Sequence, residues 1–177
     1  MGREGYLFCN EDAEAGDRFD ALATLFDPWS RDHLARLGVT EGWRCLEIGA
    51  GGGTITAWLA EQVGPTGSVL ATDLDVRWLS GRFDAAHVEV RTHDIATDPL
   101  PESTFDVIHE RLVLVHVPER EAVLHRLVTS LKPGGWLLSE TFDAEFGTNP
   151  WLSGGDPDDT GHRLVMGIQA LLRDRGA

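Results

Sequence analysis

A glycine-rich loop carries the clearest chemical signal in the sequence. It reads Gly49-Ala50-Gly51-Gly52-Gly53 and directly follows a short apolar run that ends at Ile48. Glycines let the backbone turn tightly and approach a ligand, because no Cβ intervenes. The helix predicted after the loop adds exposed N–H donors at its N-terminus. The pattern favours a site for a nucleotide-like ligand, with a glycine-rich turn that binds nothing as the alternative.

The residues around the loop bear on which ligand it binds. A dinucleotide fingerprint requires Gly-x-Gly-x-x-Gly/Ala, and here the last place after Gly49 and Gly51 is Thr54. Glu47, two positions before Gly49, would repel a pyrophosphate but suits an ammonium or sulfonium cation. The charge of Glu47 therefore argues against NAD, and an NAD-dependent oxidoreductase is kept as a remote alternative.

At these residues the sequence resembles the class I S-adenosylmethionine (SAM)-dependent methyltransferases of the small-molecule type. Glu47, Gly49, Gly51 and Gly53 match the family's first motif, acidic-x-Gly-x-Gly-x-Gly. Segments 93–95, 105–108 and 131–137 resemble later motifs in the right order, and the resemblance covers residues 40–141. It implies SAM as the cofactor, S-adenosylhomocysteine as the product, and a small-molecule methyl acceptor.

The resemblance also implies roles for single residues. Asp73, at the end of the second predicted strand, would accept hydrogen bonds from the ribose hydroxyls, or else is a strand-end turn residue. Asp94 would bind the adenine amino group or cap a turn, and Trp78 would cover the adenine or pack in the core. The predicted cofactor contacts are Glu47, Gly49, Ala50, Gly51, Asp73, Leu74, Trp78, His93, Asp94, Ile95, Glu110 and Arg111.

Three residues after the fourth predicted strand have open roles. Glu110 and Arg111 would line the methionine or substrate pocket, with a surface ion pair as the alternative reading. His116 resembles a histidine common in the family's small-molecule members and is the candidate general base, with a structural role as its alternative. No metal site is predicted.

Predicted strands and helices alternate along the chain, and this alternation places the candidate site residues at strand ends. Short apolar runs predict strands at 44–48, 68–72, 88–91, 105–109 and 136–139, with helices between them. Such alternation predicts an α/β fold with a doubly wound, mostly parallel sheet. The resemblance implies a Rossmann-like strand order of 3-2-1-4-5. It also implies one core domain at 40–145, with a helical cap at 1–39 and a loop and last helix at 146–177.

Pro28 and Gly38 predict the ends of two helices in the N-terminal part of the chain. Pro28 is expected to end a helix that carries Phe19, and a second helix is expected from an N-cap at Ser30 to Gly38. In the last part of the chain, one amphipathic helix near 160–174 leaves no room for strands six and seven of the family. We therefore expect a shortened chain whose fifth strand is a sheet edge.

That expectation has consequences for partners and activity. An open strand edge invites pairing, so a homodimer through strand five or the C-terminal helix is possible. A SAM-binding domain that is inactive without a missing C-terminal part or a partner chain is the alternative to an active enzyme.

Composition limits the other partners. The 177 residues carry 15 Lys and Arg against 29 Asp and Glu, a formal charge of −14. Such acidity disfavours nucleic acid and anionic membranes, whose binding depends on basic residues. The sequence has no signal-peptide core or membrane-length apolar run, which predicts a cytoplasmic protein. Cys45 lies in an apolar run and is expected to be a buried thiol.

Overall fold

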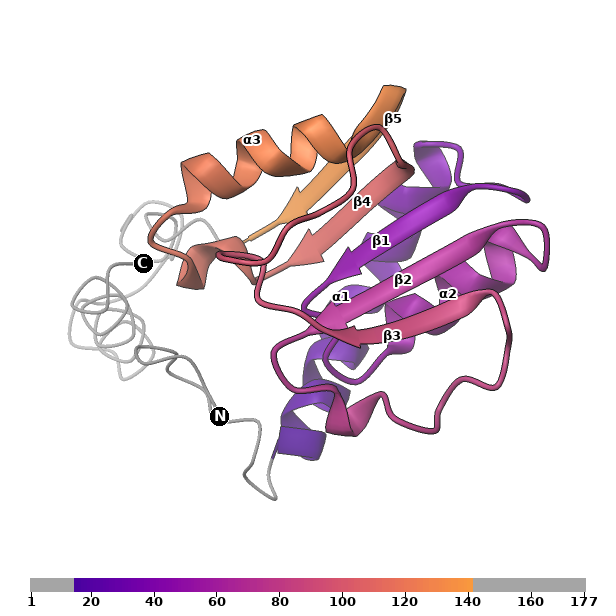
Figure 1. The fold of residues 1–177 in the computed structure, drawn as a ribbon. Helices are drawn as coiled ribbons and strands as arrows, with labels where there is room; N and C mark the ends of the chain where they lie inside the picture. The colour runs from indigo at the N-terminus through magenta and orange to yellow at the C-terminus, as the bar shows by residue number, and fades with distance from the viewer. Residues whose placement is uncertain (1–14, 142–177) are drawn as a thin grey trace, which may run out of the picture.

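A single parallel sheet organises the chain (Figure 1). The computed structural model describes residues 15–141, and the sheet order is β3-β2-β1-β4-β5. Its strands are β1 (Arg44–Ile48), β2 (Ser68–Asp73), β3 (Val88–Thr92), β4 (Phe105–Arg111) and β5 (Leu131–Glu140). The predicted strand order and fold class are confirmed.

Helices cover both faces of the sheet. They are α1 (Ala15–Arg36), α2 (Thr54–Val63) and α3 (Arg120–Ser130), with short 3₁₀ turns η1 (Val76–Trp78) and η2 (Leu114–His116). Figure 1 shows α1 and α2 behind the sheet and α3 in front of it. None of the helices between residues 15 and 141 is both long and apolar enough to cross a membrane.

Two apolar layers follow from the alternation of side chains along each strand. On one face, Cys45, Val69 and Val107 pack with Leu34 of α1 and Leu59 of α2. On the opposite face, the buried side chains of Leu46, Leu70 and Ile108 pack with those of Val123 and Leu127 from α3. Cys45 is buried as expected, and burial, with Asp106 and Glu47 nearby, raises the pKa of its thiol to about 12.

The N-terminal helix departs from the prediction. Pro28 does not end it, and Ser30 is not an N-cap, because α1 runs without a break from Ala15 to Arg36. A proline inside a helix costs about 3 kcal/mol through its missing N–H and its ring clash. Tertiary contacts offset this cost, since Asp27, Ser30 and Leu34 are buried along one face of α1. Gly38 follows the helix with a φ of 88°, in the expected left-handed conformation.

The last strand is longer than predicted. β5 begins at Leu131 and not at Trp136, so the Pro133-Gly134-Gly135 segment is part of the strand and not a turn before it. Its pairing with β4 shifts register there: Phe105 faces Leu131, whereas Val107 faces Trp136. The extra residues form a bulge, which glycines at 134 and 135 accommodate.

Among the described residues, β5 pairs only with β4, and the predicted edge position of β5 stays a prediction. The predicted helix at 160–174, the loop before it and the question of strands six and seven all lie outside the described residues.

Candidate functional site

The glycine loop joins β1 to α2 at the carboxyl end of the sheet. Gly49, Gly51 and Gly53 all have positive φ, at 66°, 53° and 78°. A Cβ at Gly49 would lie 2.2 Å from Cγ2 of Val113, and one at Gly51 would lie 3.0 Å from the Phe19 ring. The loop therefore needs glycine for its backbone conformation and for its close contacts.

Asp73 connects this loop to the end of β2. Its Oδ2 accepts a hydrogen bond of 2.9 Å from the backbone N–H of Gly51, and its Oδ1 accepts one of 3.2 Å from Asp75 N–H. Burial raises the pKa of Asp73, although these backbone donors oppose the effect. The structure thus brings the predicted ribose ligand and the predicted loop together across 22 residues of sequence.

The start of α1 lies over the same loop. Phe19 packs on Gly51 and Gly52, and its ring meets Trp78 edge-on with centroids 6.0 Å apart. Trp78 is half-buried and also contacts Gly16. Trp78 thus packs against the helix, and its predicted contact with adenine stays a prediction.

Glu47 is turned away from the surface of the loop. It is 4% exposed, and its Oε2 accepts a hydrogen bond from the Thr56 hydroxyl of α2. Burial raises the pKa of Glu47 to about 6, against the opposing influence of His109, Thr56 and Arg111. A direct contact of this carboxylate with a cofactor remains a prediction.

A surface ion pair was the alternative reading for Glu110 and for Arg111. Among the described residues Glu110 forms none, whereas Arg111 forms an ion pair that is largely buried. Glu110 is fully buried, and its Oε2 accepts from Val113 N–H at 3.0 Å and from Leu114 N–H at 3.2 Å. Its Oε1 accepts from the Ser139 hydroxyl of β5. Glu110 thereby shapes the turn that sets Val113 against Gly49. Arg111 instead binds α1, through Asp27.

The segment after β3 contains the predicted adenine contacts. Asp94 Oδ1 accepts a 2.9 Å hydrogen bond from Ala96 N–H, so its side chain caps a turn, one of its two predicted readings. His93 is buried. Its Nε2 lies 3.4 Å from the Pro99 carbonyl oxygen, and its Nδ1 has no hydrogen-bond partner among the described residues. Ile95 is buried in the apolar layer under α3.

The remaining predicted residues surround the same end of the sheet. Ala50 is buried and its N–H bonds to the Thr72 carbonyl at 3.0 Å, while Leu74 is 36% exposed just beyond Asp73. His116, on η2, is half-buried, and burial lowers its pKa. The neutral imidazole form that a general base needs is therefore favoured near neutral pH.

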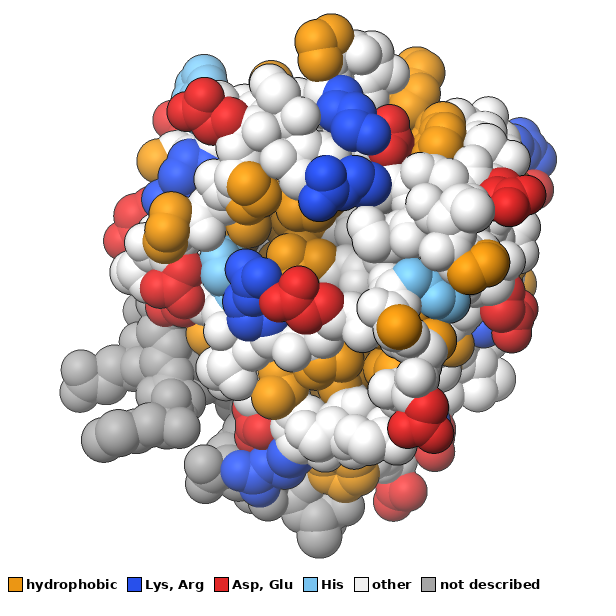
Figure 2. Space-filling view, turned by 45° about the vertical axis from the view of Figure 1, so that its right-hand side comes forward, with side chains coloured by type: hydrophobic (Ala, Val, Ile, Leu, Met, Phe, Trp, Pro, Cys, Tyr) orange, Lys and Arg blue, Asp and Glu red, His pale blue; other side chains and the backbone are white. Residues whose placement is uncertain are grey.

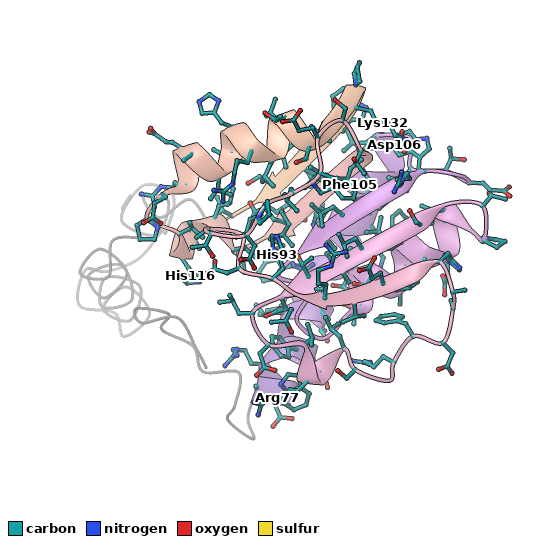
Figure 3. All side chains as sticks on the ribbon, viewed as in Figure 1. Arg77, His93, Phe105, Asp106, His116 and Lys132 are labelled. Carbon is teal, nitrogen blue, oxygen red and sulfur yellow. The ribbon has the colours of Figure 1, made fainter. Side chains whose placement is uncertain are left out.

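Figure 3 shows how the site lies relative to the sheet. His93, His116 and Arg77 lie toward the arrowhead end of the strands, whereas Phe105, Asp106 and Lys132 lie at the opposite end. A cavity of about 240 Å³ lies away from the loop, at the strand N-termini, lined in part by Arg44, Glu89 and Arg91. In the described part of the chain, no cluster of three acidic, His or Cys side chains is arranged to hold a metal.

Sequence reasoning missed two contributors to this site, Val113 and Ser139, which received no role. It placed a third, Phe19, only as a member of the helices expected to close over the cofactor. The contacts of these three residues span 29 to 64 residues of sequence, so only a tertiary fold brings them to the loop and to Glu110. The one available signal was Phe19 near the start of a helix predicted to cover the cofactor.

Comparison with known proteins places the chain in a family. Residues 46–137 match the family described as "Methyltransferase domain", a stretch of just over half of the chain that holds the glycine loop and Asp73. The chain therefore belongs to this methyltransferase family, and the sequence-based recognition is confirmed.

Curated relatives agree with that assignment. Methyltransferase str2 of Strobilurus tenacellus is 31% identical over 163 residues, which cover 90% of this chain and 55% of that protein. Ubiquinone/menaquinone biosynthesis C-methyltransferase UbiE of Ectopseudomonas mendocina is 34% identical over 117 residues, covering 62% of this chain and 46% of that protein. The chain thus spans about half the length of the curated relatives it matches.

Solved structures support the fold. A SAM-dependent methyltransferase from Aquifex aeolicus superposes with a TM-score of 0.62 at 23% identity, covering 94% of this chain and 84% of that one. One from Mesorhizobium loti superposes with a TM-score of 0.58 at 23% identity, covering 63% and 52%. At such identity the likeness shows a shared Rossmann-like fold.

Proposed function

We propose that the chain binds SAM and transfers its methyl group to a small-molecule acceptor. The observation that carries the proposal is Asp73, a buried carboxylate at the end of β2 that is hydrogen-bonded to the loop at Gly51 N–H. A carboxylate at that place can bind ribose hydroxyls. The relatives' names and the likeness to SAM-dependent methyltransferases support the proposal.

The donor set fits this cofactor better than a dinucleotide. Glu47 directly precedes the loop, and a carboxylate there disfavours the pyrophosphate of a dinucleotide, whereas Asp73 would suit the ribose of either cofactor. Asp73 would hold the ribose, the turn at 94–95 would face the adenine, and the loop backbone at Gly49 and Gly51 would approach the amino-acid part.

Positioning is the main contribution that this chain can make to the reaction. The methyl group on a sulfonium is already activated when it is bound. Correct alignment of reacting groups alone supplies effective molarities on the order of 10⁵–10⁸ M. Phe19 and Trp78, which close over the loop, would exclude water and restrict the acceptor's approach. His116 would remove a proton only if the acceptor is a weakly acidic hydroxyl or an ammonium.

The acceptor is proposed to be a neutral or cationic small molecule. The formal charge of −14 supports this choice over nucleic acid, and on the face in Figure 2 basic, acidic and apolar side chains are interspersed. Curated relatives include one named for ubiquinone and menaquinone biosynthesis. Because the chain spans about half of those relatives, a SAM-binding domain that needs further chain or a partner for turnover remains the second candidate.

Calorimetric titration of S-adenosylhomocysteine into the protein tests the cofactor site. We expect micromolar binding, weakened at least tenfold in Asp73→Asn, which keeps the shape of the side chain but loses its charge. Asp106→Asn is the matched control, because Asp106 also accepts from a backbone N–H, that of Arg44 at 2.7 Å, but at the other end of the strands.

The control should bind S-adenosylhomocysteine within twofold of wild type. No binding by folded wild-type protein, or binding of NAD in its place, would contradict the proposal. Methyl-transfer assays with SAM then separate an active enzyme from a binding domain.

A further inference from the structure

A polar layer lies between α1 and the sheet, beyond the glycine loop and on the same face as the apolar layer of α2. It contains three residues of α1 and three from the ends of β4 and β5. Its members are Asp27, Ser30, His33, His109, Arg111 and Glu140. This layer is what joins the C-terminal half of α1 to the strand ends.

Arg111 makes the central contacts of the layer. Its two terminal nitrogens each donate to Asp27 Oδ1 at 3.1 Å, and Nη1 also donates to the Ser30 hydroxyl at 2.9 Å. Asp27 is 6% exposed and Ser30 is fully buried. These two residues flank Pro28, the position where α1 lacks a backbone N–H. Arg111 therefore bridges the weakest point of the helix.

Glu140 makes the second connection. Its Oε1 lies 2.9 Å from Nδ1 of His33 on α1, and its Oε2 lies 2.9 Å from Nε2 of His109 on β4. Charge-assisted hydrogen bonds such as these are about twice as strong as neutral ones. The sheet thus holds α1 from two strands at neighbouring points.

The other end of α1 covers the cofactor loop. Phe19 lies about 12 Å along the helix from Asp27, at a rise of about 1.5 Å per residue. It packs on Gly51 and Gly52 and against Trp78. Because a helix transmits displacement along its axis, the orientation of α1 at Asp27 determines where Phe19 meets the loop.

We propose that Arg111 and Glu140 are positioning residues that act on the cofactor site through α1 and have no direct contact with the cofactor. They fix the helix across Pro28 and thereby hold Phe19 over the glycine loop. The inference rests on the proposed function for its cofactor, and it replaces the predicted role of Arg111 as a pocket-lining residue.

Two arginines on one carboxylate provide a matched test. Arg31 also donates to Asp27, at 3.1 Å from Nη2 to Oδ2, but it belongs to α1, and within residues 15–141 its ion pair stays inside that helix. We expect Arg111→Met to weaken S-adenosylhomocysteine binding about tenfold and to raise amide hydrogen exchange in residues 16–26 to a similar extent. Arg31→Met should change neither by more than twofold.

Conservative variants keep the test decisive if Arg111→Met fails to fold. Arg111→Lys keeps the positive charge but has a single donor nitrogen, and it should give intermediate affinity and exchange. Glu140→Gln should loosen the same α1 segment without changing exchange in α3. A lower melting temperature with unchanged affinity in the Arg111 variants would overturn the proposal, as would equal effects of Arg31→Met and Arg111→Met. If wild-type protein binds no S-adenosylhomocysteine, the proposed function fails, while the exchange comparison still decides whether Arg111 seats α1.

Discussion

Four buried or half-buried carboxylates at the carboxyl end of the sheet differ in role because their partners differ. Glu47 accepts a hydrogen bond from the Thr56 hydroxyl, and Asp73 accepts one from the Gly51 N–H of the loop. Glu110 accepts hydrogen bonds from backbone N–H groups of the turn after β4, and Glu140 is hydrogen-bonded to both His33 and His109. Only Asp73 has its partner in the glycine loop itself, which is why the proposed cofactor site is centred on it.

Titration of Glu47 gives a prediction at this scale. Burial raises its pKa from 4.5 to about 6, so the folded protein holds the proton more tightly than the unfolded chain. The stability it contributes is full below pH 4.5 and is lost as the pH rises through 6. As the pH rises from 5 to 7, we expect the free energy of unfolding of Glu47→Gln to increase by about 1 kcal/mol relative to that of wild type.

Urea denaturation at both pH values measures this difference. The exposed Glu61→Gln on α2 serves as the control and should show no such change. Titration of Glu140 does not contribute to this difference between pH 5 and pH 7. Although burial raises its pKa, hydrogen bonds from His109, Ser30 and His33 outweigh that effect and lower the pKa to about 2, so its contribution is lost only below pH 4.5. A constant difference between Glu47→Gln and wild type across this pH range would contradict the raised pKa of Glu47.

At the scale of elements, the loop after β1 and the turn after β4 fit together. The Glu110 carboxylate fixes Val113, and Val113 occupies the space that a side chain at Gly49 would fill. The first motif is therefore constrained by a second segment, 64 residues later, as well as by any ligand.

Substitution of Gly49 separates the two constraints. Gly49→Ala places a Cβ at a φ of 66° and 2.2 Å from Val113 Cγ2, so it should lose more stability than Gly81→Ala. Gly81 has a φ of 75° with open space around it, and its substitution should cost only the backbone term of about 1–2 kcal/mol.

The double variant Gly49→Ala with Val113→Ala is the informative control. In a double-mutant cycle, Gly49→Ala in the Val113→Ala background should lower the free energy of unfolding only as much as Gly81→Ala does in wild type. Equal free energies of unfolding for Gly49→Ala and Gly81→Ala would show that contact with Val113 does not limit the loop.

At the scale of the whole molecule, the sheet is open at both sides in the region from 15 to 141. β3 pairs only with β2 and β5 only with β4, and Trp136 of β5 is 50% exposed. An exposed strand edge presents unpaired N–H and C=O groups to another chain. The sequence-based proposal of a homodimer through β5 therefore has a surface on which to form.

We expect concentration-dependent dimerisation in sedimentation velocity. Trp136→Lys should weaken it at least tenfold, because a charge on the edge strand opposes pairing. Val128→Lys on α3 is the control, since Val128 is similarly exposed, at 59%, but lies on a helix. A protein that stays monomeric at every concentration would contradict this proposal.

The strand order was implied by the resemblance to the methyltransferases. The parallel sheet and the place of the glycine loop were determined by the sequence by itself. These depend on local patterns, namely apolar runs, glycines with positive φ and turn residues, whose physics acts within a few residues. The role of Asp73 was implied by the resemblance, and it agrees with the sheet geometry, because the carboxyl ends of adjacent parallel strands meet at one edge of the sheet.

Only the tertiary structure decided what surrounds that loop. Pro28 predicted a helix end, but contacts from Arg111, 84 residues away, and the burial of Ser30 and Leu34 keep α1 continuous. Trp136 predicted a strand start, but β4 pairs with β5 from Leu131 onward. In both cases long-range hydrogen bonds outweigh a local breaker, and such bonds leave no pattern in the sequence between their partners.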